Sequence, residues 1–270
     1  MATDPPLLWQ ALAKAFHART CIDVPHNHLD YYLSQGGIHL NEHFDEAAQR
    51  HTLTLVTEPM NPEVPIIIGT AFHTLRSALD TAVSTLVADA KGVPSGRENF
   101  PMHSTEQELR AMFEPGHRQC SACGDVRESK PAANTIIEYL PDLQKLIFET
   151  FKPWEDGNFP IWALGRLDNI NKHRMIMPVL ANITWSDSVM LTSNNSMNWK
   201  PSYTLPPGNQ VIISRTVEPV TFYEKGTFKA TLAFPSDIPF GGKPVFETLE
   251  ELLQLVTGII ETLEAQFKRT

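Results

Sequence analysis

One long segment, residues 64–90, constrains the fold more than any other part of the sequence. Its apolar residues recur at steps of three and four, which is the spacing of one buried face of an α-helix. Threonines and a serine recur at the same steps on the opposite side and predict a solvated face. The pattern therefore predicts a long core helix. The apolar positions are Phe72, Leu75, Leu79, Ala82, Leu86 and Ala90.

The rest of the N-terminal half is also predicted to be mostly helical. Apolar periodicity predicts one helix over residues 6–19 and another over residues 161–174. We expect the first helix to end before Pro25. Between them we expect further elements of both kinds. These are a helix near residues 38–50, a strand over 51–58, a short helix from Ser104, a polar exposed excursion over 115–131, and helical pieces over 133–140 and 141–151.

The character of the sequence changes at Met175. Short β-branched or aromatic stretches follow, separated by turn residues, and the helical spacing returns at residues 244–267. We expect an α+β fold in which a helix-rich N-terminal half packs with a C-terminal antiparallel β-meander and a closing helix. No Ser/Gly-rich linker separates the halves, so a single domain over 1–270 is expected. Its parts are a helical part of about 1–174, a β-meander of about 175–234 and a closing helix of about 244–268.

Charge and composition restrict the function. The chain has 22 Lys+Arg against 31 Asp+Glu, and this net charge of −9 disfavours an extended nucleic-acid surface while leaving room for a local phosphate site. No apolar run approaches the roughly 18–20 residues that span a bilayer. Residues 1–6 lack the basic stretch of a secretion signal, and three cysteines cannot all pair. We expect a cytoplasmic protein with no membrane partner.

Two segments resemble motifs of a widespread group of uncharacterised bacterial proteins. Residues 68–80 are similar to that group's G-D-x-x-H-N-L-R-S-A-L-D-H helix, and residues 167–174 to its later D-K-H-R segment. Phe100-Pro101 matches a Phe-Pro pair that lies between the two motifs. The resemblance covers about residues 50–185 and implies no established activity. The chain departs from the pattern at Thr70 (Asp in the group), Thr74 (Asn) and Thr81 (His).

A more distant similarity is to the HEPN helical ribonucleases, whose signature is an Arg followed after four to six residues by a His on the same helix. That similarity implies an Arg that holds a phosphate and a His that moves a proton at a ribose 2′-OH without a metal. Arg76 lacks such a His. Arg166 and His173 satisfy the spacing, because seven residues at about 100° each bring the two side chains within about 20°. The pairs Arg19/His26 and Arg110/His117 share the spacing, with Pro25 and Pro115 expected to break their helices.

Charged residues at the margin of the 64–90 stripe form the main candidate site. His73, Arg76 and Asp80 lie on one flank of that helix, and we expect them to face the charged residues of the 161–174 helix across a cleft. In this hypothesis arginines bind an anion, histidines transfer protons and aspartates orient those cations. The expected ligand is an RNA-like or phosphorylated small molecule, bound or cleaved without a cofactor. The facing residues are Asp168, Lys172, His173 and Arg174, with Arg166 and His173 as the HEPN-like pair.

A different class of protein stays open as the first alternative. In a non-catalytic structural or interaction protein, Arg76 and Asp80 would form an ordinary ion pair one helical turn apart. The cations of residues 172–174 would then complement the dipole at a helix C-terminus. We also allow for a homodimer.

A zinc-dependent hydrolase is the second alternative. His39, Glu42 and His43 match H-x-x-E-H, in which two His one helical turn apart bind zinc and the Glu acts on the bound water. Cys120 and Cys123 have the spacing of half a zinc site or of a redox pair. The sequence contains no glycine-rich nucleotide loop and no G-x-S-x-G.

Overall fold

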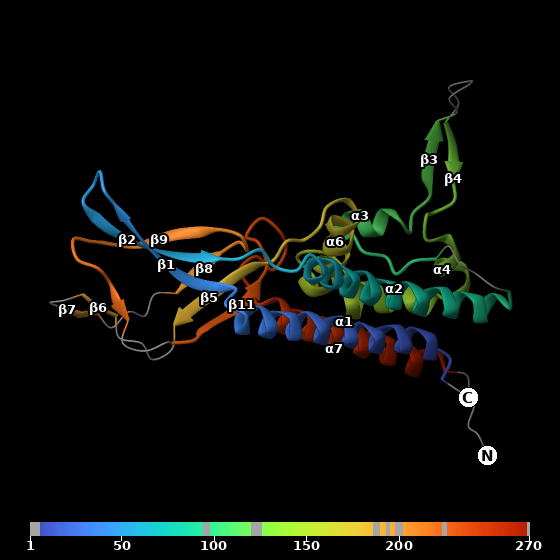
Figure 1. Ribbon diagram of the computed structural model, residues 1–270. Coiled ribbons are helices and arrows are strands. Elements are labelled where there is room, and N and C mark those ends of the chain that lie inside the picture. The colour runs from blue at the N-terminus through green and yellow to red at the C-terminus, as the bar shows by residue number, and fades with distance from the viewer. Residues whose placement is uncertain are drawn as a thin grey trace, which may run out of the picture. The chain divides into compact units, whose positions relative to one another are not determined.

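The computed structural model describes residues 6–93, 98–119, 126–185, 190–192, 195–197, 202–222 and 226–268. By its internal contacts the chain divides into two compact units. Unit 1 comprises Met1–Cys21, Gly69–Arg174 and Leu249–Thr270, and unit 2 comprises Ile22–Ile68 and Met175–Thr248. The α+β class is confirmed, with helices, antiparallel three-stranded sheets and a closing helix (Figure 1). The expectation of a single domain stays a prediction.

Three long helices contribute residues to both units: α1 (Trp9–Ser34), α2 (Glu63–Lys91) and α7 (Val245–Phe267). The predicted core helix is confirmed, because α2 extends only one residue beyond it at each end. Its side chains at Phe72, Leu75 and Leu79 are completely buried, as the apolar stripe requires. The predicted closing helix is confirmed by α7.

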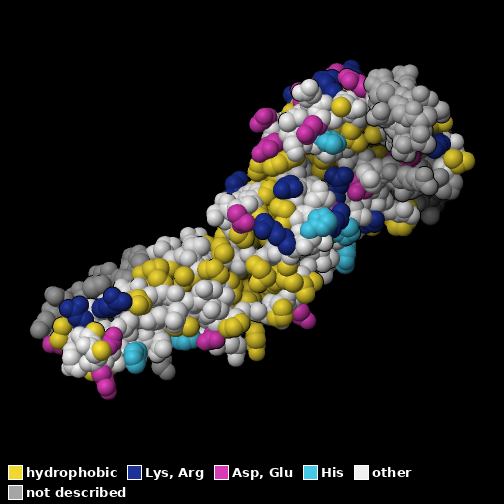
Figure 2. Space-filling view, turned by 90° about the horizontal axis from the view of Figure 1, so that it is seen from above, with side chains coloured by type: hydrophobic (Ala, Val, Ile, Leu, Met, Phe, Trp, Pro, Cys, Tyr) yellow, Lys and Arg dark blue, Asp and Glu magenta, His cyan; other side chains and the backbone are white. Residues whose placement is uncertain are grey.

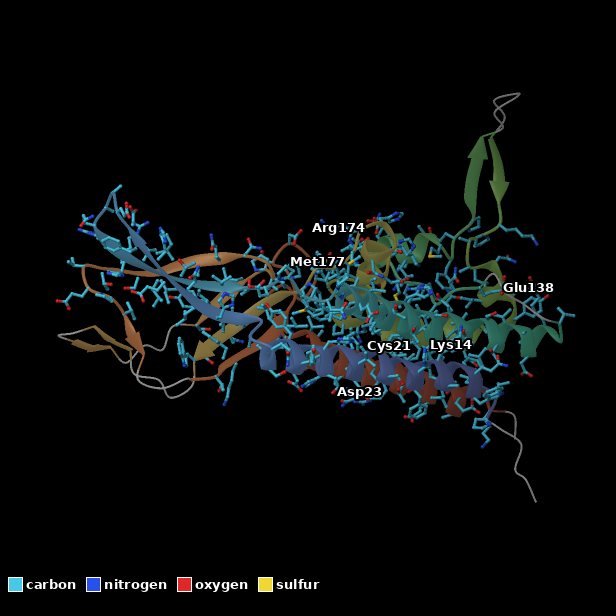
Figure 3. The ribbon with its side chains drawn as sticks, viewed as in Figure 1. Lys14, Cys21, Asp23, Glu138, Arg174 and Met177 are labelled. Carbon is cyan, nitrogen blue, oxygen red and sulfur yellow. The ribbon has the colours of Figure 1, made fainter. Side chains whose placement is uncertain are left out.

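Within unit 1, α1 lies beside α7 and also contacts α2 (Figure 1). The Glu264 carboxylate of α7 accepts hydrogen bonds from the main-chain N–H groups of Leu7 and Leu8, at 2.9 and 2.6 Å, just before α1 begins. These N–H groups have no partner inside the helix, so the carboxylate acts as their cap. Lys14 of α1, labelled in Figure 3, donates to the hydroxyls of Ser77 and Thr81 on α2, both at 2.8 Å. The hydroxyl face of α2 thus receives a cation from α1.

Shorter elements complete unit 1. The helix expected from Ser104 begins at Glu106, because its N-cap is Thr105, which forms a reciprocal capping box with Glu108. The helices predicted over 133–140, 141–151 and 161–174 are confirmed, the second ending in a π-helical turn. Residues 116–119 and 126–129 form two antiparallel strands that extend away from the helices of this unit (Figure 1). The elements are α3 (Glu106–Ala111), β3 (Gly116–Gln119), β4 (Val126–Ser129), α4 (Asn134–Tyr139), α5 (Pro141–Leu146), η1 (Ile147–Phe151) and α6 (Phe159–His173).

Unit 2 contains three antiparallel sheets of three strands each. The strands expected after Met175 are found, but they do not form one meander, because two of them pair with segments far away in the sequence. β9 extends the hairpin β1–β2, and β11 pairs with β5, which β8 joins on its other side. The third sheet has the order β10-β6-β7. The strands are β1 (Ile38–Asp45), β2 (Arg50–Thr57), β5 (Val179–Trp185), β6 (Met190–Thr192), β7 (Asn195–Met197), β8 (Tyr203–Leu205), β9 (Gln210–Thr216), β10 (Thr221–Phe222) and β11 (Phe228–Ala233).

The expected end of the first helix before Pro25 is wrong, because α1 continues through this proline to Ser34. A proline inside a helix loses one backbone hydrogen bond and costs roughly 3 kcal/mol. Ile22 and Leu29, on either side of Pro25, are 3% and 5% exposed. Burial of these side chains offsets the local penalty, so tertiary packing decides here over propensity.

The helix expected near residues 38–50 is also wrong. Strand β1 pairs along its whole length with β2, from Ile38 opposite Thr57 to Asp45 opposite Arg50. Between the strands, the Asp45 carboxylate accepts from the N–H groups of Ala47 and Ala48, both at 3.0 Å. This side-chain turn reverses the chain and lets the ladder with β2 form in place of a helix.

Candidate functional site

Helices α2 and α6 approach each other closely in unit 1, and a glycine on each helix makes this approach feasible. A Cβ on Gly69 of α2 would overlap the side-chain amide of Asn171 on α6. A Cβ on Gly165 of α6 would lie 2.8 Å from the sulfur of Met102 and 3.4 Å from Nη1 of Arg76. The two glycines therefore allow the charged flank of α2 to contact α6.

Arg76 and Asp80 hold the main chain of Phe100 between them. The Arg76 guanidinium donates to the Phe100 carbonyl at 2.6 Å, and the Phe100 N–H donates to Asp80 Oδ1 at 2.9 Å. Arg76 and Asp80 also form an ion pair with each other, in which Nη2 lies 3.1 Å from Oδ1. Because Phe100 is completely buried, the pair satisfies both main-chain groups of a core residue. We refer to this arrangement as the Phe100 clamp.

Asp168 forms a second cluster with Lys172 of its own helix and His73 of α2. Its carboxylate, only 3% exposed, lies 2.6 Å from Lys172 Nζ and 3.1 Å from His73 Nδ1. A buried carboxylate needs partners of this kind to remain charged. With its proton on Nδ1, His73 donates to Asp168 and keeps Nε2 as a proton acceptor. The His73 side chain is 59% exposed, so this second nitrogen is accessible to solvent.

A cavity of about 480 Å³ lies between these clusters. Arg76, Arg166 and Lys172 supply three cations to its wall, against the two carboxylates of Asp80 and Asp168. Figure 2 shows Lys and Arg side chains, in dark blue, gathered with His side chains, in cyan, on the face seen from above. The remaining lining residues are Asn99, Met102, His103, Ser104, Trp162, Gly165 and Asn169.

Five of the eight predicted site residues meet at this cavity, namely Arg76, Asp80, Arg166, Asp168 and Lys172. His73 contacts Asp168 from outside the lining. His173 is the last residue of α6 and Arg174 caps it; both are exposed and neither belongs to the described lining (Figure 3 labels Arg174). Arg166 and His173 share one helix face as predicted, but seven residues separate them by about 10 Å along the axis.

Sequence reasoning missed the two polar side chains Asn99 and His103. Both lie in the loop that carries Phe100-Pro101, and they line the cavity because the Phe100 clamp holds this loop on α2. They lie beside the Phe100-Pro101 pair, which the sequence resemblance already identifies, and this proximity could have indicated them. Asn169, which follows Asp168 directly, also lines the cavity.

The zinc-hydrolase geometry predicted for H-x-x-E-H is wrong, because these residues lie on strand β1. Side chains alternate between the faces of a strand, so Glu42 points away from His39 and His43, which are about 13 Å apart along the strand. Glu42 instead pairs with His51 at 3.0 Å and accepts from the Val220 N–H. Within the part of the chain that the structure describes, no group of three or more His, Cys, Asp or Glu side chains could hold a metal ion.

The remaining cysteine and proline expectations have mixed outcomes. Cys120 and Cys123 lie outside the described residues. Cys21 is buried and unpaired, and its burial raises the pKa of its thiol. Arg19 and His26 do share one helix despite Pro25, but Arg19 pairs with Glu250 and the His26 ring stacks on Phe246. His117 lies on β3, outside the helix that carries Arg110, as expected.

No protein-family model, curated protein or solved structure matches this chain. The resemblances to the bacterial group and to the HEPN ribonucleases therefore stay predictions. Of the helices in the described ranges, none has both the length and the apolar composition that crossing a bilayer requires.

Proposed function

We propose that the cavity between α2 and α6 binds the phosphate group of a phosphorylated small molecule or of an RNA-like ligand. The observation that carries the proposal is the excess of cations in the wall, three against two carboxylates, in a chain whose net charge is −9. The two carboxylates pair with Arg76 and Lys172, so Arg166 is the cation of the wall that has no carboxylate partner among the described residues.

Arg166 and Lys172 are the side chains that we expect to contact the ligand. Arg166 is exposed on the cavity wall and, among the described residues, takes part in no ion pair. Its planar guanidinium can hold two phosphate oxygens at once. Lys172 is half-exposed, and among the described residues its three N–H donors have one ion-pair partner, Asp168. Arg76, in contrast, is bound into the Phe100 clamp and positions the loop.

The test is isothermal titration calorimetry with adenosine monophosphate, and with adenosine as the uncharged comparison. We expect the phosphate compound to bind and adenosine to bind at least about tenfold more weakly. Arg166→Gln and Lys172→Gln should each weaken phosphate binding by about tenfold, the loss of one charge-assisted hydrogen bond. Lys145→Gln, which changes an exposed lysine of α5 outside the cavity, is the matched control. Equal affinities for both compounds would contradict the proposal.

Cleavage of an RNA-like ligand is the second candidate function, and the His73–Asp168 contact favours it. In this reaction Nε2 of His73 takes the proton of a ribose 2′-OH, the 2′-oxygen attacks phosphorus, and the 5′-oxygen leaves with a proton from a general acid, giving a cyclic phosphate. A labelled single-stranded RNA incubated with chelator measures it. We expect cutting that both His73→Gln and His173→Ala reduce, the latter as the second proton carrier. Cutting that neither variant changes would point to a contaminating nuclease.

The structural alternative also has a specific observation in its favour, the Phe100 clamp. It assigns Arg76 and Asp80 to stability and predicts that their substitution lowers the melting temperature. If no phosphate compound binds and these substitutions lower the melting temperature, the charged residues have a structural and not a catalytic role.

A further inference from the structure

A second cavity, of about 600 Å³, lies in unit 2 and shares no residue with the phosphate site. Its first wall is one side of α1, to which His28, Tyr31 and Tyr32 contribute side chains. Its second wall is the segment after β2, with Glu58, Pro59 and Met60. A cavity of this size is typical of sites for small organic ligands.

The base of this cavity is held in place by hydrogen bonds. The Tyr32 hydroxyl donates to the carbonyl of Gly37 and lies 2.8 Å from the carbonyl of Glu58. A Cβ on Gly37 would overlap the Tyr32 ring, so the main chain contacts the ring face directly. Further along, the Thr57 hydroxyl donates to the Asn209 carbonyl of the β8–β9 turn at 2.9 Å and lies 3.0 Å from the Pro206 carbonyl. The segment that carries Glu58 is thus anchored on both sides.

The charge of the lining is opposite to that of the phosphate site. Glu58 supplies a carboxylate, and no lysine or arginine belongs to the described lining. The Glu58 side chain is 55% exposed, and it lies 3.8 Å from the ring of His39, which is itself exposed. An ion pair at this distance and exposure contributes little, so the carboxylate can accept a ligand cation. His28 on the opposite wall faces Glu63, at 3.8 Å.

Apolar surface lies next to this carboxylate. The Tyr31 side chain is 66% exposed although it lines the cavity, and Pro59 and Met60 face it from the second wall. A tyrosine ring attracts a cation over its face, and a methionine sulfur contacts an aromatic ring favourably. We propose that this cavity binds a small aromatic amine in its cationic form, with the ammonium group at Glu58 and the ring against Tyr31 and Met60.

Three indole compounds of similar size and different charge test the proposal. Tryptamine is the cation, indoleacetate the anion and methylindole the neutral compound, and calorimetry measures the affinity of each for the full chain. We expect tryptamine to bind at least about tenfold more tightly than methylindole. Indoleacetate should bind most weakly, because its carboxylate meets Glu58.

Two substitutions locate the binding. Glu58→Gln should weaken tryptamine binding by about tenfold and leave methylindole unchanged, and Tyr31→Ala should weaken both. Glu149→Gln and Tyr139→Ala change exposed residues of unit 1 and are the matched controls. Arg166→Gln should leave tryptamine binding unchanged, so this proposal and the phosphate site fail independently. The proposal is overturned if tryptamine does not bind, if indoleacetate binds as tightly, or if Glu58→Gln has no effect in a protein with unchanged thermal unfolding.

Discussion

At the scale of single residues, an ion pair that holds a main-chain segment differs from one that only joins two side chains. Phe100 is buried, and its N–H and carbonyl reach only Asp80 and Arg76 among the contacts described above. An unpaired N–H in such a position costs about 1–3 kcal/mol. The clamp therefore links the stability of unit 1 to the position of the loop that forms one wall of the cavity between α2 and α6.

Asp80→Ala should lower the free energy of unfolding by about 2 kcal/mol, because it leaves the Phe100 N–H and the Arg76 guanidinium without their carboxylate. Asp80→Asn keeps an acceptor for the N–H and should lose less. Urea denaturation measures both, with Asp156→Ala, an exposed aspartate in the loop before α6, as the control. A loss for Asp80→Ala no larger than that of the control would contradict the clamp.

Tyr32 makes the stability of the fold sensitive to alkaline pH. Burial, together with the negative charge of Glu58, raises its pKa to about 12 from an ordinary value of 10.0. A group whose pKa is raised in the folded state stabilises the fold below its unfolded pKa, and this contribution is lost as the pH rises through the folded value. The stabilisation should therefore be complete below about pH 10 and disappear toward pH 12.

Urea unfolding across this range, together with the ultraviolet absorbance of tyrosinate, checks this expectation. Tyr32→Phe should remove the late tyrosinate signal and the additional loss of stability. Tyr31→Phe is the control, because it keeps the hydroxyl of Tyr32 and should behave as the unmodified protein. An unchanged late signal in Tyr32→Phe would show that another group titrates there.

At the scale of elements, the sequence predicts best where one helix buries one face. The apolar residues of α2, α6 and α7 are regularly spaced. Each end of these three helices lies within two residues of its predicted position. α1 and β1 were mispredicted because contacts outside the element itself decide them. Burial of the residues around Pro25 keeps α1 helical, and pairing with the neighbouring strand β2 makes β1 a strand.

In the candidate site, too, the residues on regular helices were predictable and those placed by distant contacts were not. Arg76, Asp80, Asp168 and Lys172 were predictable, since helical spacing fixes which charged residues share a flank. Asn99 and His103 were not, because they lie on a loop whose position depends on the clamp. His173 and Arg174 were predicted to face the cleft, but α6 ends at this point and leaves both exposed outside the described lining.

Gly69→Ala tests the close approach of α2 and α6. Alanine favours a helix over glycine by about 1 kcal/mol, but here its methyl group would overlap the Asn171 amide. We expect a net loss of about 1 kcal/mol in the free energy of unfolding. In an Asn171→Ala background the same change should become stabilising. Thermal unfolding of the four proteins gives the coupling between the two positions.

Gly258→Ala on α7 is the matched control for this cycle, because a Cβ there meets no atom within 4 Å. It should raise the free energy of unfolding by up to about 1 kcal/mol, because only the difference in helix propensity between alanine and glycine acts there. If Gly69→Ala stabilises as much as Gly258→Ala, the two helices do not require a glycine at their contact.

At the scale of the whole molecule, the proposed phosphate site is a small cationic area on an acidic chain with a net charge of −9. A polyanion longer than this site meets the negative net charge of the rest of the chain. We therefore expect a single-stranded RNA of about ten nucleotides to release few counterions. With two phosphate contacts, the logarithm of its binding constant should fall with the logarithm of salt concentration at a slope of about −1.4.

Fluorescence anisotropy of labelled RNA over a series of salt concentrations measures this slope. Lys172→Gln should make it shallower by about 0.7, and Lys145→Gln should leave it unchanged. A slope several times steeper would require an extended cationic surface and would contradict a local site.

The division of the chain also affects how the protein is made on the ribosome. Unit 1 needs both Met1–Cys21 and Leu249–Thr270, and unit 2 needs Ile22–Ile68 together with Met175–Thr248. Neither set is complete until most of the chain has left the exit tunnel. The N–H groups of Leu7 and Leu8 can meet the Glu264 carboxylate that caps them only after the 256 residues that follow Leu8 have been synthesised. Until then the apolar face of α1 lacks its partner on α7, and exposed apolar surface of this kind favours aggregation.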